Sequence, residues 1–294
     1  MTEPDHRHGA TGVGTSGTGN LQRRIASAAV LAPAVLAITY LGGWIFLALC
    51  TLASGGILWE WTSLVLRRAD ARILTPGWTA LVLAGAFVGI GLPYGSFGTI
   101  VIGAALVGVV LVAFPGKGLA PSQAEWGAAG AVYAGAALLG PALLRRDPEW
   151  GLTALLFLFA SVWFTDIFAY LFGHLIGGPR LWPALSPNKT WSGAFGGLIG
   201  GVAAGIVVAY ASGVAKLGMI GVMALLLSVL AQAGDLFESA VKRRFGAKNA
   251  SHLIPGHGGL MDRLDGFLVA ALAALIIGIL RDGTGAPARG LLVW

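Results

Sequence analysis

The chain has 294 residues, of which 56% are hydrophobic and only 11% are charged, with a mean hydropathy of +0.79. This composition excludes a soluble globular domain and predicts an integral membrane protein. The net charge of +6 does not indicate a nucleic-acid partner, because the basic residues flank apolar runs, as they do at the ends of membrane spans. The single Cys50 excludes an intrachain disulfide and a cysteine metal site.

Residues 1–22 are polar and rich in Gly, Thr and His, which predicts a disordered cytoplasmic tail. Arg23 and Arg24 precede an apolar run that resembles the core of a signal peptide. Because the polar leader is long and further apolar runs follow, we expect an uncleaved first helix.

The rest of the chain is predicted to be all-α and polytopic. A spanning helix needs about 20 mostly apolar residues, and about nine segments come close enough to this length. These segments are 25–41, 44–66, 77–94, 98–114, 126–144, 151–173, 192–213, 217–237 and 266–281.

The distribution of Lys and Arg predicts the orientation in the membrane. With the N-terminus inside and the C-terminus outside, most of the 19 basic residues lie on the inner side, although Arg145 and Arg146 run against the trend. The two charged loops, 174–191 and 238–265, then face the cytoplasm. Glycine-rich spans such as 192–213 predict close helix packing, which also allows a homodimer.

Two carboxylic acids lie inside apolar runs, where a charge is costly. Glu60 lies in the second expected span, and Asp166 lies in the sixth, with Tyr170 one turn later on the same face. Either carboxyl group can simply be protonated or hydrogen-bonded to a neighbour. Asp166 is the stronger functional candidate because a charged loop follows its helix directly.

That loop ends in Ser186-Pro187-Asn188-Lys189-Thr190, just before the glycine-rich span. Backbone N–H groups at the start of a helix, together with Lys and hydroxyl side chains, suit an anionic ligand such as phosphate. The alternative is an ordinary helix N-cap, with Lys189 facing lipid headgroups.

The segment 234–266 concentrates charged residues in an otherwise apolar chain. If the helix of the eighth span continues past Gly234, Asp235, Glu238, Ser239 and Lys242 lie on one face. This face would then carry both acidic and basic side chains at the border of the membrane. The alternative for the whole segment is a basic patch attracted to anionic lipids, which does not explain the acids.

At the start of the ninth span, Asp262 and Asp265 are three residues apart and can point the same way. Bringing the two helix ends together would gather carboxylates beside bases, a set that suits Mg²⁺ with substrate phosphates. The turn at 255–259 allows a close approach to a ligand. Its His257 either donates to a phosphate or is only a polar loop residue.

At these residues the chain resembles the phosphatidate cytidylyltransferase (CDP-diacylglycerol synthase) family. The family signature has the form S-x-x-K-R-x4-K-D, followed by P-G-H-G-G-x-x-D-R-x-D, and the resemblance covers about residues 163–281. Here the signature reads Ser239, Lys242, Arg243, Lys248 and Asn249, then Pro255 to Gly259, Asp262, Arg263 and Asp265. Ser186, Pro187, Lys189 and Thr190 match a second motif, Ser-Pro-x-Lys-Thr, and Asp166 and Tyr170 match a D-x-x-A-Y element.

Three positions depart from the family pattern. Asn249 replaces the usual aspartate, Ser192 stands where many members have glutamate, and His174 stands where arginine is common. Loss of activity is therefore an alternative to the activity that the family implies.

The resemblance implies an enzyme of a bacterial-type inner membrane, with its active site facing the cytoplasm. It would condense CTP with phosphatidic acid, among membrane lipids, to give CDP-diacylglycerol and pyrophosphate. Residues 23–150 would hold the N-terminal transmembrane helices, and 151–294 the catalytic domain. The cofactor would be Mg²⁺, with a second cation as an option. The implied catalytic residues are Asp235, Asp262, Asp265 and Lys242; the metal ligands are Asp235, Asp262 and Asp166; and the substrate-binding residues are Ser186, Lys189, Thr190, Ser239, Arg243, Lys248, His257 and Arg263.

Other functions stay open at this point. The same chemistry on another lipid phosphate, such as a polyprenyl-type phosphate, fits the same residues. A transporter could use Asp166 and Glu60 on an ion path, but it predicts paired repeats with broken helices, and the sequence has no convincing repeat. A lipid-binding scaffold would tolerate loss of the carboxylates.

Overall fold

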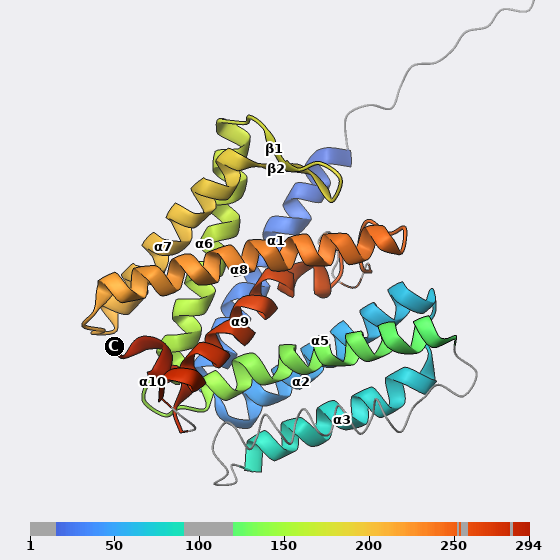
Figure 1. The fold of residues 1–294 in the computed structure, drawn as a ribbon, viewed down its shortest axis with the longest axis horizontal. Coiled ribbons are helices and arrows are strands. Elements are labelled where there is room, and N and C mark those ends of the chain that lie inside the picture. The colour runs from blue at the N-terminus through green and yellow to red at the C-terminus, as the bar shows by residue number, and fades with distance from the viewer. Residues whose placement is uncertain (1–15, 91–119, 252, 254–257, 283–284) are drawn as a thin grey trace, which may run out of the picture.

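The computed structural model describes residues 16–90, 120–251, 253, 258–282 and 285–294, and this part of the chain is mostly helical (Figure 1). One short antiparallel hairpin, β1 and β2, interrupts the helices. The elements are α1 (Ser16–Leu41), α2 (Gly43–Leu66), α3 (Ala71–Ile90), α5 (Pro121–Arg145), α6 (Gly151–Leu175), β1 (Arg180–Trp182), β2 (Ser186–Thr190), α7 (Trp191–Ala211), α8 (Leu217–Arg244), α9 (Met261–Asp282) and α10 (Pro287–Leu292).

Seven of the described helices, α2, α3 and α5 to α9, are long and apolar enough to cross a membrane. The expected span 25–41 lies in α1, whose apolar part, Ala29–Leu41, is shorter than a usual span. The expected span 98–114 lies outside the described residues. The predicted class of helical, multi-span protein is confirmed, whereas the number nine and the orientation of the termini stay predictions.

The chain folds into two groups of helices that meet at α9 (Figure 1). On one side, α6 and α7 form an antiparallel pair with the β-hairpin at one end, and α8 packs across both. On the other side, α2, α3 and α5 pack together. Helix α9 contacts α8 and α6 in the first group and α5 and α2 in the second. The start of α9 therefore lies where both halves of the chain meet.

Glycine lets α6 and α7 approach each other closely, as their sequence predicts. A Cβ atom added at Gly197 would lie 2.8 Å from the carbonyl oxygen of Thr165. At Gly193 it would lie 2.7 Å from the carbonyl oxygen of Ala169. Any side chain at these two positions would push the helices apart, so the glycines serve as packing positions.

The outer faces of the helices carry large apolar side chains. Ile167 on α6, Ile199 on α7, Val222 on α8 and Leu280 on α9 are all exposed. Apolar faces of this extent are typical of surfaces that contact lipid. Buried side chains such as Trp61, which is 1% exposed, fill the interior between the helices.

The turn between α2 and α3 is held by Asp70, which is buried. Its carboxylate accepts hydrogen bonds from the backbone N–H of Arg72 at 3.0 Å and from the Arg72 and Arg68 guanidinium groups. The hydrogen bond from the Arg72 side chain holds the pKa of Asp70 well below its ordinary value. Asp70 therefore caps the start of α3, which begins at Ala71 and continues through Pro76.

Candidate functional site

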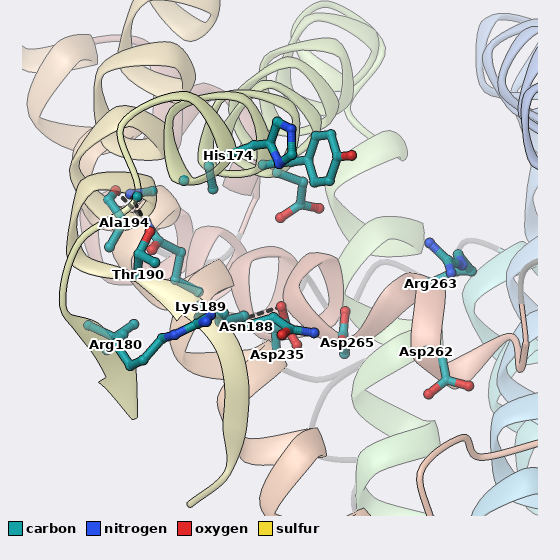
Figure 2. A pocket seen from close by; sticks show the side chains of 18 of the residues that line it. His174, Arg180, Asn188, Lys189, Thr190, Ala194, Asp235, Asp262, Arg263 and Asp265 are labelled. Carbon is teal, nitrogen blue, oxygen red and sulfur yellow. Dashed lines mark hydrogen bonds and ion pairs between the residues drawn. The ribbon is translucent and has the colours of Figure 1, made fainter. Parts of the chain in front are cut away.

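A cavity of about 1190 Å³ lies between α6, the β-hairpin, the start of α7, the end of α8 and the start of α9 (Figure 2). Its lining combines acidic and basic side chains from segments that are far apart in the sequence. Of the predicted site residues, the lining includes Asp166, Lys189, Thr190, Asp235, Lys242, Asp262, Arg263 and Asp265. It also includes Tyr170, His174, Arg180, Asn188, Gln232 and Asn249.

Three carboxylates from two helices meet beside this cavity. Asp235 and Glu238 lie one turn apart on α8, which continues to Arg244 as expected, and Asp265 lies on α9. One carboxylate oxygen from each residue lies within 4.8 Å of the others. Glu238 is only 1% exposed, and its carboxylate contacts the ammonium group of Lys242 and the carboxyl group of Asp265. Like charges held this closely repel one another, and a cation or a shared proton relieves the repulsion.

Two lysines supply positive charge at these carboxylates. The Nζ atom of Lys242 lies 2.5 Å from Oε2 of Glu238 and 2.6 Å from Oδ1 of Asp262. It therefore joins α8 to α9. Lys189, on β2, forms an ion pair with Oδ2 of Asp235 and so joins the hairpin to α8 (Figure 2). Each lysine thus connects elements that the chain brings together only on folding.

Asp262 is not part of the group formed by Asp235, Glu238 and Asp265, and its carboxylate instead accepts hydrogen bonds from the loop before α9. Its Oδ2 atom accepts hydrogen bonds from the backbone N–H of Gly259 at 2.8 Å and of Ala250 at 3.1 Å. Its other oxygen accepts from Lys242. In Figure 2 its carboxylate lies apart from Asp235 and Asp265. The structure thus brings Asp235 together with Glu238 and Asp265, and a metal shared by Asp235 and Asp262 stays a prediction.

Asp166, the third predicted metal ligand, lies on α6 and lines the cavity. It is not part of the carboxylate trio. Tyr170 and His174 follow it along the same face of α6, and their rings stack with centroids 6.1 Å apart. This face of α6 therefore forms a wall of the cavity that is partly aromatic.

Thr190 is the N-cap of α7. An N-cap and a phosphate-binding site were the two alternatives that the sequence left open for this segment. Its Oγ1 atom accepts a hydrogen bond from the backbone N–H of Gly193 at 3.1 Å. The neighbouring Ser192 bonds to the same hydroxyl at 3.0 Å and donates to the carbonyl oxygen of Gly177. The serine found where many family members have glutamate therefore fastens the start of α7 to the turn after α6. Lys189 points into the cavity, not to the lipid surface.

Four predicted substrate-binding residues do not line the cavity: Ser186, Ser239, Arg243 and Lys248. Arg243 and Lys248 are exposed, and Arg243 lies 3.5 Å from the carbonyl oxygen of Leu185 in the hairpin. His257 lies outside the described residues. Asn249, the position that departs from the family signature, lies on the cavity wall.

Glu238 and Gln232 were not assigned a function from the sequence. Helical spacing put Glu238 on the face of Asp235, and the burial of its carboxylate shows that it belongs to the acidic group. Gln232 lies one turn before Asp235 on α8 and donates to the carbonyl oxygen of Ala194 at 3.3 Å. The same periodicity, extended one turn toward the N-terminus, would have found it.

The chain is similar to known proteins over most of its length. The Cytidylyltransferase family matches residues 22–280. A phosphatidate cytidylyltransferase of Brucella abortus biovar 1 (strain 9-941) is 44% identical over 264 residues, which cover 88% of this chain and 93% of the relative. One of Staphylococcus saprophyticus subsp. saprophyticus is 44% identical over 131 residues, which cover 44% of this chain and 50% of the relative. The chain therefore belongs to the cytidylyltransferase family.

Proposed function

We propose that this chain is a phosphatidate cytidylyltransferase, which condenses CTP with phosphatidate to give CDP-diacylglycerol and pyrophosphate. A relative named phosphatidate cytidylyltransferase, which is 44% identical over 88% of this chain, supports this activity. The observation that carries the proposal is the group of three carboxylates beside Lys189 and Lys242 in one cavity. Such a cavity, at about 1190 Å³, has room for a nucleotide and a lipid headgroup.

The reaction is a displacement at the α-phosphorus of CTP. An oxygen of the phosphatidate phosphate forms the new bond to this phosphorus, and the bond to the bridging oxygen of the β-phosphate breaks, so pyrophosphate leaves. Such a transfer depends mainly on positioning and on neutralising the charge of the phosphates. Lys189, Arg263 and Arg180 line the cavity and would hold the phosphates.

The carboxylates fit Mg²⁺, which prefers oxygen ligands and commonly keeps one or two carboxylates together with substrate phosphates. Asp235, Glu238 and Asp265 would hold the ion, because one carboxylate oxygen from each already lies within 4.8 Å of the others. When bound, the ion would neutralise charge on the phosphates and the leaving pyrophosphate. Asp262 and Asp166 face the same cavity and remain further predicted ligands.

Several apolar helices and bacterial relatives indicate a multi-pass membrane protein. We propose that it lies in a bacterial inner membrane with the cavity at the cytoplasmic face. There, CTP from the cytoplasm and the headgroup of a membrane lipid would reach the same site. Homodimer formation stays a prediction.

Purified full-length protein, given labelled CTP, phosphatidate and Mg²⁺, tests the activity. We expect labelled CDP-diacylglycerol, and at least a hundredfold less from Asp265→Asn, a loss typical of removing a group that stabilises transferring phosphates. Thr79→Val, on the exposed part of α3, serves as the control and should keep the wild-type rate. Product from a polyprenyl phosphate but not from phosphatidate would show that the lipid substrate is a polyprenyl phosphate. No product from either lipid would refute the proposal.

A further inference from the structure

Glu60 is a charged side chain of the N-terminal half that makes its contacts in the C-terminal half. It lies on α2, within a membrane-spanning helix, and it is 0% exposed. Its carboxylate is not part of the cavity lining as far as the described residues go. A buried carboxylate in a span is costly and needs a reason, and the catalytic groups described above do not include it.

All the described hydrogen bonds of Glu60 go to the start of α9 and the loop before it. Oε1 accepts from the backbone N–H of Leu260 at 2.8 Å and from Oγ of Ser251 at 2.6 Å. Oε2 accepts from the backbone N–H of Met261, the first residue of α9, at 2.6 Å. The first N–H groups of a helix have no partner within the helix and carry its positive end, so a carboxylate is a well-matched cap.

The close fit around Glu60 leaves little freedom in this contact. A Cβ atom added at Gly259 would lie 2.9 Å from both oxygens of Glu60 and 3.0 Å from Oδ2 of Asp262. One at Gly56, a turn earlier on α2, would lie 3.0 Å from Leu260. The two carboxylates of Glu60 and Asp262 therefore flank Gly259 and together take the N–H groups of three successive residues, Gly259 to Met261.

We infer that Glu60 is a positioning residue, which fixes the start of α9 and thereby places Asp262, Arg263 and Asp265 in the cavity. Its hydrogen bonds connect residues about 200 positions apart in the sequence and join α2 to the start of α9. Two of the hydrogen bonds described for Glu60 come from the backbone at the start of α9, and it acts through this backbone, from which the cavity-lining carboxylates project. This inference rests on the proposed function for its kinetic consequences, but not for its structural ones.

Glu60→Gln is the direct test, because a glutamine has the same shape and replaces one acceptor by a donor. Whichever way its amide faces, at least one backbone N–H of Leu260 or Met261 meets an NH₂ group. We expect kcat to fall by about tenfold or more, since small displacements of catalytic groups carry large penalties, with the KM for CTP changed less than about threefold. Thr62→Val is the matched control: Thr62 lies on the same helix, is equally buried and has no hydrogen-bond partner for its hydroxyl among the described residues.

Hydrogen exchange of the full-length protein in detergent gives a readout that is independent of activity. In Glu60→Gln we expect faster exchange of the amides at 258–262, with unchanged exchange in α3. Wild-type kcat with unchanged exchange would overturn the inference. So would exchange that is accelerated equally in α3, because it would show general loss of stability, or a rise in KM with kcat unchanged.

Ser251→Ala decides the matter if Glu60→Gln does not fold. It removes one of the three hydrogen bonds to Glu60, together with the bond that the same hydroxyl accepts from the backbone N–H of Leu253. We expect a kcat lowered by about threefold, the cost of roughly one hydrogen bond, and the same local acceleration of exchange. Normal values of both would overturn the inference. If wild-type protein makes no CDP-lipid, the proposed function fails, and the exchange data alone still decide the role of Glu60.

Discussion

Lys242 lies between carboxylates of two different helices, and this makes it a residue on which both charge and structure depend. Glu238 is 1% exposed and Asp262 10% exposed, so removing the ammonium would leave two carboxylates with little access to water. Removing one partner of a buried charge pair costs about 3–5 kcal/mol, far more than the pair itself contributes. Loss of Lys242 is therefore expected to destabilise the protein mainly because two buried carboxylates would remain without their positive partner.

We predict that Lys242→Met lowers the thermal unfolding midpoint of the purified protein in EDTA, by an amount that corresponds to about 3 kcal/mol or more. Because methionine keeps the aliphatic part of the side chain, the loss of stability measures the effect of removing the positive charge. Adding Glu238→Gln to this variant should regain part of the stability, because it removes one of the stranded carboxylates. A single variant as stable as wild type, or a double variant that is less stable than the single one, would contradict this account.

The identity of the metal ligands can be tested by comparing two aspartates that are one turn apart on α9. If Asp235, Glu238 and Asp265 hold Mg²⁺, Asp265→Asn should raise the Mg²⁺ concentration for half-maximal activity by roughly tenfold or more, equal to about 1.4 kcal/mol of lost binding. Asp262→Asn should lower kcat with a smaller change in Mg²⁺ dependence. The reverse order would favour the predicted pairing of Asp235 with Asp262.

At the residue scale, the sequence predicted many of the acidic and basic residues that line the cavity, but not how they pair. Helical spacing placed Asp235, Glu238 and Lys242 on one face because α8 continues unbroken past Gly234. It could not show that Lys242 and the backbone of 250–259 would hold Asp262. Those contacts include backbone N–H groups of Ala250 and Gly259, which lie outside any helix, and helical periodicity does not describe them.

Helices α6 and α7 are the element pair whose spacing the glycines set. We predict that Gly197→Ala destabilises the protein by about 1–3 kcal/mol, because its Cβ would lie 2.8 Å from the carbonyl oxygen of Thr165 and the helices must move apart. Activity should fall as well, since Lys189 and Thr190 lead directly into α7. Thermal unfolding and initial rates measure the two effects.

Gly218→Ala is the matched control, because a Cβ atom at Gly218 on α8 meets nothing within 4 Å. It should be neutral or stabilising by a few tenths of a kcal/mol, since alanine is the better helix former. Equal effects at Gly197 and Gly218 would show that backbone preference, not the contact between α6 and α7, sets the cost.

At the element scale, eight of the nine expected spans lie in described helices, and seven of these helices are long and apolar enough to cross a membrane. The differences lie at the helix ends. Helix α3 starts at Ala71, six residues before the predicted start at residue 77, because Asp70 caps it; Pro76 lies inside the helix. Helix α9 starts at Met261, before the apolar run, because Glu60 supplies its cap from α2. The β-hairpin was expected only as a loop, since strands of three and five residues give no periodic signal.

The whole molecule has charged loops at one end of α8 and few basic residues at the other, which is the basis for its predicted orientation. Lys248 lies just after α8 and Lys216 just before it, and both are exposed. The helix has 28 residues, so at about 1.5 Å per residue it exceeds the roughly 30 Å of a bilayer core. The two lysines are therefore expected on opposite sides of the membrane, with Lys248 on the side of the cavity.

Single cysteines at these two positions can test this orientation, because the natural Cys50 is buried and can be replaced by serine. In intact cells, a membrane-impermeant maleimide should label Lys216→Cys and leave Lys248→Cys unlabelled until the membrane is permeabilised. The variant without cysteine controls for labelling elsewhere. The opposite pattern would reverse the orientation and place the cavity away from cytoplasmic CTP, which would also contradict the proposed reaction. Equal labelling of both positions in intact cells would show instead that α8 does not span the membrane.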